Sequence, residues 1–79
     1  MATYTIRYAD RARSVKQSLS AEQRTSLEAL EKRLAGNPYG HGAQSNRDNS
    51  WSAAFTGGVI TYIVSNRHLV INVIAVVGY

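Results

Sequence analysis

The sequence predicts an α+β domain in which a helical hairpin packs on one face of a small, mainly antiparallel four-stranded sheet, in the order β-α-α-β-β-β. Polar and apolar residues alternate over residues 3–8, apolar residues recur at helical spacing over residues 11–36, and three short apolar segments fill residues 51–77. Because helical and extended segments are grouped along the chain, this arrangement is favoured over alternating strands and helices. The 79 residues contain no internal repeat, so we expect one domain over residues 1–79.

The first two elements are a strand over residues 3–8 and a short amphipathic helix over residues 11–19. Asp10 stands where the N-cap of this helix is expected. The apolar face of the strand consists of Tyr4, Ile6 and Tyr8. The apolar stripe of the helix consists of Ala12, Val15 and Leu19.

The second helix has clear signals at both ends. Ser20 and Gln23 form a Ser-x-x-Gln capping box at its start. Gly36 is the expected residue just beyond its end, and Pro38 prevents the helix from resuming. Its buried stripe consists of Leu27, Leu30 and Leu34. Since almost no residues separate the two helices, we expect them to fold back as a hairpin.

The second half of the chain is predicted to be a loop followed by a three-stranded meander. Residues 36–50 are rich in Gly, Asn and Ser and are expected to form the loop. The strands are expected at residues 51–55, 59–64 and 69–77. Turns at Gly57-Gly58 and at residues 65–67 connect them.

The last predicted strand is apolar on both of its faces, which is typical of a central strand. The helical hairpin covers one face of the sheet, and no further helix is predicted to cover the other. An apolar sheet face left open on a small domain indicates a binding surface for a partner.

Nine basic and five acidic residues give a net charge of +4, and the excess lies near the N-terminus. Residues 1–16 contain four basic residues and one acidic residue, whereas residues 17–35 contain three of each. This distribution favours a polyanionic partner, with solubility alone as the alternative explanation. Arg11, Arg13 and Lys16 are therefore candidates for nucleic-acid or ribosome binding, and a solvated helix face is the alternative.

The sequence contains no cysteine, which excludes disulfides and thiolate metal sites and is compatible with the cytoplasm, where we expect the protein to act. Its first residues lack the apolar segment of a signal peptide. The longest apolar stretch, residues 69–77, is much shorter than the roughly 20 residues of a membrane-spanning helix. We therefore expect no association with a membrane.

Several of these features recur together in one group of proteins. A strand with tyrosines leads into a basic helix, a leucine-rich helix ends in Asn37-Pro38, and a meander follows with Trp51, the Gly57-Gly58 turn and Tyr62. This order and spacing resembles the RelE/ParE superfamily of bacterial toxins over nearly the whole chain.

The resemblance implies the toxin of a type II toxin–antitoxin pair, neutralised by an antitoxin protein that wraps around it. Toxins of the RelE branch cleave mRNA in the ribosomal A site, ParE-branch toxins poison DNA gyrase, and neither needs a cofactor. The expected function is growth inhibition by blocking translation, by a metal-independent endoribonuclease where the chemistry is retained. Two alternatives stay open: a gyrase inhibitor, and a degenerate toxin that only binds its antitoxin or forms a homodimer.

RNA cleavage through the 2′-hydroxyl needs a base for that hydroxyl, a cation for the phosphate and an acid for the leaving oxygen. RelE-type toxins supply them from Lys and Arg on the meander strands and from an Arg or His and a Tyr near the C-terminus. This chain has Ser52, Ala54 and Val59 where such cations usually project, and Tyr79 about where the terminal Arg is expected. The resemblance therefore implies the toxin fold, with neutral residues at three positions that are usually cationic in the family.

Four other residues are candidates for the missing chemistry. His41 and His68 can act as acid or base near neutral pH, Arg47 can contact a phosphate, and Tyr79 can act as a general acid or stack on a base. For each of them an ordinary loop, turn or terminal role is the alternative. The two histidines and five scattered carboxylates do not form a metal-binding pattern.

Overall fold

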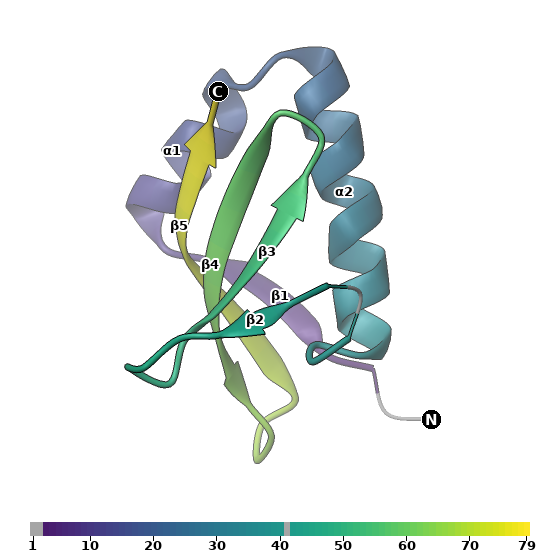
Figure 1. The fold of residues 1–79 in the computed structure, drawn as a ribbon, viewed down its shortest axis with the longest axis vertical. Coiled ribbons are helices and arrows are strands. Elements are labelled where there is room, and N and C mark those ends of the chain that lie inside the picture. The colour runs from purple at the N-terminus through teal and green to yellow at the C-terminus, as the bar shows by residue number, and fades with distance from the viewer. Residues whose placement is uncertain (1–2, 41) are drawn as a thin grey trace.

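The structure is a computed structural model and describes residues 3–40 and 42–79. Helices and strands follow the predicted order, with one short strand added in the predicted loop (Figure 1). The elements are β1 (Thr5–Tyr8), α1 (Asp10–Ser18), α2 (Ala21–Gly36), β2 (Gln44–Ser45), β3 (Trp51–Phe55), β4 (Gly58–Ser65) and β5 (Val70–Gly78).

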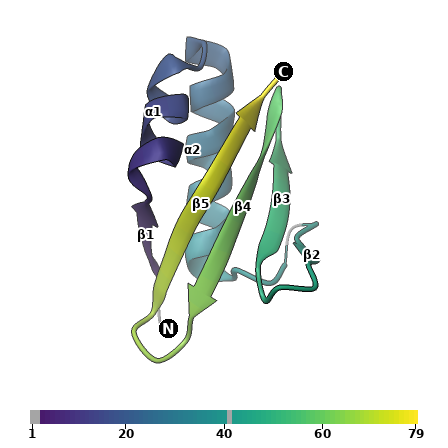
Figure 2. The ribbon, with the colours of Figure 1, turned by 90° about the vertical axis from the view of Figure 1, so that its left-hand side faces the viewer.

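The five strands form one sheet in the order β1-β5-β4-β3-β2. β1 pairs in parallel with β5, and all other neighbours are antiparallel. The last strand is therefore central, as its two apolar faces predict. Both helices lie on the same face of the sheet and leave the opposite face open (Figure 2).

Three details of the predicted elements were wrong. The sheet has five strands and not four, because Gln44–Ser45 pairs with the start of β3; a strand of two residues leaves no alternating pattern for the sequence to reveal. The N-cap of α1 is Ala9, and Asp10 lies inside the first turn, where its carboxylate still complements the helix dipole. Gly36 is the last residue of α2 and not the residue just beyond it. Asn37 is the C-cap and has an extended backbone conformation.

The capping box of α2 is confirmed. The Gln23 backbone N–H donates to the Ser20 hydroxyl at 3.1 Å, and the Ser20 N–H donates to the Gln23 side-chain oxygen at 2.9 Å. The Gln23 side chain also donates to the Gly57 carbonyl at 2.9 Å, which joins the start of α2 to the β3–β4 turn. The same residue thus fixes the helix boundary and its position over the sheet.

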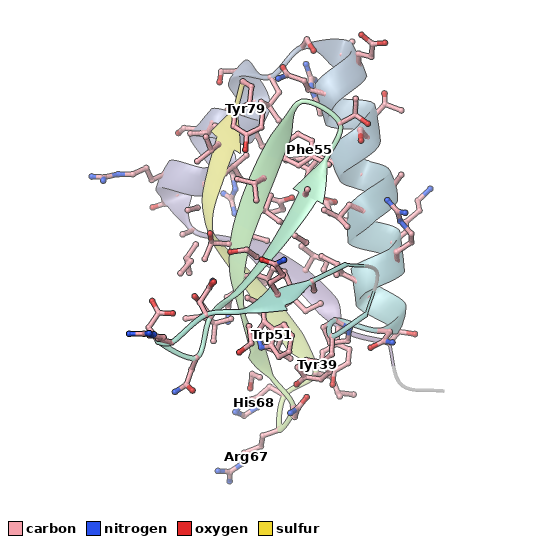
Figure 3. The ribbon with its side chains drawn as sticks, in the orientation of Figure 1. Tyr39, Trp51, Phe55, Arg67, His68 and Tyr79 are labelled. Carbon is pink, nitrogen blue, oxygen red and sulfur yellow. The ribbon has the colours of Figure 1, made fainter. Side chains whose placement is uncertain are left out.

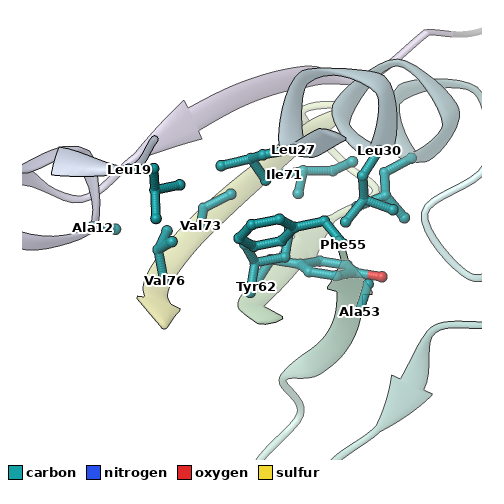
Figure 4. Packing of buried hydrophobic residues seen from close by; sticks show 12 residues of the cluster. Ala12, Leu19, Leu27, Leu30, Ala53, Phe55, Tyr62, Ile71, Val73 and Val76 are labelled. Atoms are coloured by element: carbon teal, nitrogen blue, oxygen red, sulfur yellow. The ribbon is translucent and has the colours of Figure 1, made fainter. Parts of the chain in front are cut away.

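A single cluster of buried apolar side chains lies between the helices and the sheet (Figure 4). The three leucines predicted for α2 are at most 1% exposed. They pack over the inward side chains of the central strands. The buried members are Ala12, Leu19, Leu27, Leu30, Leu34, Ala53, Phe55, Ile60, Tyr62, Ile71, Val73 and Val76.

A β-bulge keeps the last strand packed along its full length. The register of β4 on β5 steps between Thr61 and Tyr62, which leaves Ile74 without a partner on β4. The inward–outward alternation shifts by one residue at this point. As a result Val73 and Val76, which are three residues apart, are both buried, whereas Ile74 is 41% exposed.

Tyr62 is fully buried beneath α2, and its hydroxyl donates to the Pro38 carbonyl at 2.6 Å. Burial, with a smaller contribution from the nearby Tyr39 phenol, raises the pKa of Tyr62 to about 12. The hydrogen bond ties the segment after α2 to the middle of the sheet.

The raised pKa of Tyr62 predicts a specific loss of stability in alkali. Because the folded pKa exceeds the unfolded value of about 10, stability is complete below pH 10 and is lost as pH rises towards 12, by roughly 2 kcal/mol. At neutral pH we expect Tyr62→Phe to lower the free energy of unfolding by about 1–3 kcal/mol, because the Pro38 carbonyl loses its donor. Urea unfolding of the wild type and the variant, at neutral pH and in alkali, should show that the difference in free energy of unfolding shrinks in alkali. A difference that does not change with pH would contradict the raised pKa of Tyr62.

Candidate functional site

The helix-free face of the sheet presents neutral side chains at its centre. Ala54 pairs directly with Val59, and Ser52 pairs with Thr61, all on the side opposite the buried residues of the same strands. The positions where the resemblance predicts cations are therefore neighbours on one surface. In this structure that surface offers hydroxyl and methyl groups, which cannot neutralise charge developing on a phosphate.

The same face also exposes apolar side chains. Ile63 and Ile74 are each 41% exposed and Val77 is 50% exposed, in strands whose other side is buried. Val77 pairs with Val59, so the apolar surface is continuous with the neutral centre of the face. We call Val59, Ile63, Ile74 and Val77 the apolar face. Its side chains favour a contact driven by burial and not by charge.

Two of the predicted catalytic residues, His68 and Tyr79, lie far apart (Figure 3). His68 lies in the turn between β4 and β5, whereas Tyr79 follows the far end of β5, is 85% exposed and donates its backbone N–H to Gly57 at 2.8 Å. The eight residues of β4 separate these two ends, which at about 3.4 Å per residue puts them more than roughly 20 Å apart. His41 lies outside the described residues.

Arg47 occupies an exposed turn between β2 and β3. Its neighbour Asp48 accepts hydrogen bonds from the Ser50 hydroxyl and the Ser50 backbone N–H, which hold the pKa of Asp48 below its usual value. These bonds shape the turn without involving the guanidinium group. Arg47 is thus exposed to solvent, and it adds no cation to the neutral centre of the sheet.

Trp51 packs against the core and is not an open stacking platform. It is half-buried, and its ring meets that of Tyr39 edge to face with centroids 5.0 Å apart. The Tyr39 hydroxyl donates to Asn66 in the β4–β5 turn at 2.7 Å, and the Tyr4 hydroxyl donates to the same oxygen at 2.6 Å. This group of side chains holds one end of the sheet together.

The three basic residues of α1 have different surroundings. Arg11 and Arg13 are exposed. Lys16 forms an ion pair with Glu31 of α2 at 2.9 Å and lies 4.7 Å from the centre of the Tyr8 ring. The predicted binding group therefore contains two available arginines and one lysine that joins the two helices.

Glu31 also accepts a hydrogen bond from the Tyr8 hydroxyl. Burial, followed by the hydrogen bond and the negative charge of Glu31, raises the pKa of Tyr8 well above its ordinary value. One carboxylate thus connects β1, α1 and α2.

One basic residue that did not stand out in the sequence lies at the β1 edge of the open face. Arg7 points outward from β1 and pairs in register with Asn72 of β5. Two shallow hollows, of about 460 and 690 Å³, meet at these two residues. The alternation of residues 3–8 predicts an outward Arg7, but only the pairing of β1 with β5 shows what lies beside it.

No family model and no curated protein matches this sequence. Solved structures match its fold. The toxin–antitoxin complex RelBE2 from Mycobacterium tuberculosis matches with a TM-score of 0.87 and 18% identity, over 100% of this chain and 94% of that chain. The isolated E. coli RelE toxin matches with a TM-score of 0.83 and 19% identity, over 95% and 83% of the two chains. A YoeB/ParE toxin from Agrobacterium tumefaciens matches with a TM-score of 0.82 and 14% identity, over 95% of this chain and 98% of that chain.

This chain has the RelE/ParE toxin fold. The fold expected from Asn37-Pro38, Trp51, the glycine turn and Tyr62 is confirmed. At identities of 14–19% the likeness concerns the fold, so the chemistry has to be argued from the surface of this chain.

Two further features bear on the site. Among residues 3–40 and 42–79, no three His, Asp or Glu side chains gather where they could hold a metal ion. Neither helix in the described part of this RelE/ParE-like fold is long and apolar enough to cross a membrane.

We expect Glu31→Gln to lower the free energy of unfolding by about 1–3 kcal/mol, because the neutral amide weakens the bonds to both Tyr8 and Lys16. Glu28→Gln is the matched control on the exposed side of α2 and should change it by less than about 0.5 kcal/mol. Urea unfolding at neutral pH measures both variants. Equal losses would show that Glu31 has no special structural role.

Proposed function

We propose that this chain is the toxin of a toxin–antitoxin pair that acts in the cytoplasm and stops growth by blocking translation through binding, without cutting mRNA. The single observation that supports it most is the fold, which covers 94% of the matched RelBE2 chain and 83% of the isolated RelE toxin. The neutral centre of the open face supports binding over cleavage.

The argument against cleavage comes from the three groups that the reaction needs. A cation has to lie within about 3 Å of the phosphate oxygens to lower the barrier, and the positions facing the open centre are Ser52, Ala54 and Val59. An acid and a base have to reach the same phosphate from two sides. His68 and Tyr79 lie at opposite ends of the β4–β5 hairpin and cannot do so together.

An antitoxin is the proposed protein partner. The matched structures include toxin–antitoxin complexes, among them an archaeal RelE–RelB complex from Pyrococcus horikoshii with a TM-score of 0.80 and 14% identity. In this chain the apolar face offers the burial that an amphipathic helix or a strand needs. A second copy of the chain covering the same face, as a homodimer, is the competing arrangement.

Inhibition of DNA gyrase is the second candidate function. The neutral centre favours any target held by binding alone, and one matched toxin carries the name YoeB/ParE. Binding to gyrase does not require the cation, acid and base that RNA cleavage needs. A degenerate toxin that only holds its antitoxin stands as the outcome in which no target is inhibited.

Inducible expression in a bacterial host, with growth, protein synthesis and mRNA 5′ ends followed together, tests the proposal. We expect growth arrest and a fall in protein synthesis without new mRNA ends. New ends inside coding frames would show cleavage and return attention to His41, Arg47, His68 and Tyr79. Growth arrest with continuing translation and broken DNA would favour inhibition of DNA gyrase. Normal growth would favour a degenerate toxin that only binds its antitoxin.

The apolar face predicts that the purified chain binds an apolar fluorescent dye. We expect Ile63→Ser and Ile74→Ser each to reduce the dye signal, while the free energy of unfolding falls by only about 1 kcal/mol because these side chains are 41% exposed. Thr25→Ser, on the exposed side of α2, is the control and should leave the signal unchanged. A wild-type chain that is monomeric and binds no dye would contradict a free apolar face.

A further inference from the structure

The linker between the two helices consists of only two residues, Leu19 and Ser20. Both have an extended backbone, and the chain reverses direction there (Figure 1). Residues 9–35 contain neither glycine nor proline, so every residue of this stretch tolerates a helical conformation. The reversal depends on side-chain caps: the Ser20–Gln23 capping box, and the Arg24 guanidinium, which donates to the Leu19 carbonyl at 3.3 Å.

The buried side chains of α1 and α2 also fit one continuous helix. At about 100° per residue, they fall within one arc of about 120° when the two helices are joined without a bend. These residues are Ala12, Val15, Leu19, Leu27, Leu30 and Leu34. In the straight helix the last carbonyls of α1 accept from the first N–H groups of α2, which replaces the caps of the bent form. The sequence is therefore compatible with both forms.

The straight form cannot keep β1 and α1 on their own sheet. A helix from Asp10 to Gly36 is about 40 Å long, whereas the longest extent of the folded chain is 33 Å. β1 is an edge strand paired with β5, and α1 packs mainly against β5. Straightening the linker therefore uncovers the edge of β5 and frees Glu31 from Tyr8 and Lys16. The surface that fits these groups best is the same segment of a second copy.

We propose that the chain forms a dimer by exchanging β1 and α1 between two copies, with the linker helical and residues 10–36 forming one helix in each copy. β1 of each copy then pairs with β5 of the other, and Lys16 of each copy pairs with Glu31 of the other. Arg7 of one copy meets Asn72 of the other, so the hollows between them are built from both chains. The exchange leaves the apolar face uncovered and does not rest on the proposed function.

The proposal is tested by refolding the chain from urea over a range of protein concentrations and measuring the mass of the products by size-exclusion chromatography with light scattering. We expect a dimer whose share rises with the concentration during refolding. Ala21→Pro should weaken dimerisation more than about a hundredfold, because proline fits the first position of α2 but breaks the interior of a continuous helix. Ser20 already has the extended conformation that a following proline requires, so the monomer should fold normally.

Ser20→Ala should have the opposite effect, because it removes the side-chain cap that holds the bent form. Each cap is worth about fivefold and the dimer contains two linkers, so dimerisation should strengthen roughly thirtyfold. Ser14→Ala, on the exposed side of α1, is the matched control and should change dimerisation by less than about twofold.

A pair of introduced cysteines shows which chain supplies β1. The sequence has no cysteine of its own, and Thr5 lies opposite Val70 in the β1–β5 pairing. When Thr5→Cys and Val70→Cys are combined and the dimer fraction is oxidised, exchange places the disulfide between chains, and a denaturing gel should show a covalent dimer. The monomer fraction should oxidise within the chain and run as a monomer.

Three outcomes would overturn the proposal. The first is a chain that stays monomeric at every concentration, both as the wild type and as Ser20→Ala. The second is dimerisation of Ala21→Pro as strong as that of the wild type, with circular dichroism showing that the variant is folded. The third is a dimer whose cysteine pairs close within each chain, which would show that two copies meet without exchange. All three concern the purified chain, so they are independent of growth arrest in cells.

Discussion

The parallel pairing of β1 with β5 is the constraint on which the rest of the structure depends. It joins the first and last strands of the chain, with Thr5 opposite Val70 and Tyr8 opposite Val73. Because β4 pairs with the other edge of β5, the last strand is enclosed on both sides and can be apolar on both faces. The two helices that follow β1 directly are then held over one face, which leaves the other face to function.

The elements of the fold were largely predictable because their signals are local. The capping box at Ser20, the leucine stripe and the glycine turn each depend on residues within a few positions of one another. The two-residue strand β2 and the β-bulge at Ile74 were not, since each exists only through pairing with another strand. The same limit hid the pairing of Arg7 with Asn72, which come from the first and last strands of the chain.

The candidate site was predictable in part. The resemblance assigned Ser52, Ala54 and Val59 to positions that are usually cationic, and the register puts Ala54 opposite Val59. Treating the basic residues of α1 as one group was less accurate, because Lys16 is held by Glu31 of α2. A side chain on an amphipathic helix can be assigned to the solvent side from its spacing, but its ion-pair partner on a second helix depends on how the two helices pack.

The distribution of charge on the open face favours binding of a ligand over its cleavage. Cations that lower a reaction barrier have to touch the reacting group, whereas cations that position a strand can act from the side. In this chain the centre of the face is neutral, and the arginine lies at the edge beside Asn72. Such an arrangement offers a cation at the edge of the face and no group at its centre that would stabilise charge on a phosphate.

The β-bulge makes the two surfaces of this face mutually dependent. Ile74 is the unpaired residue of the bulge, and it belongs both to the apolar face and to the lining of a hollow beside Arg7 and Asn72. A protein segment that buries Ile74 therefore covers part of that hollow as well. The antitoxin that we propose would thus cover the hollow beside Arg7 without contact with a catalytic centre, on an open face that has none of the expected cations at its centre.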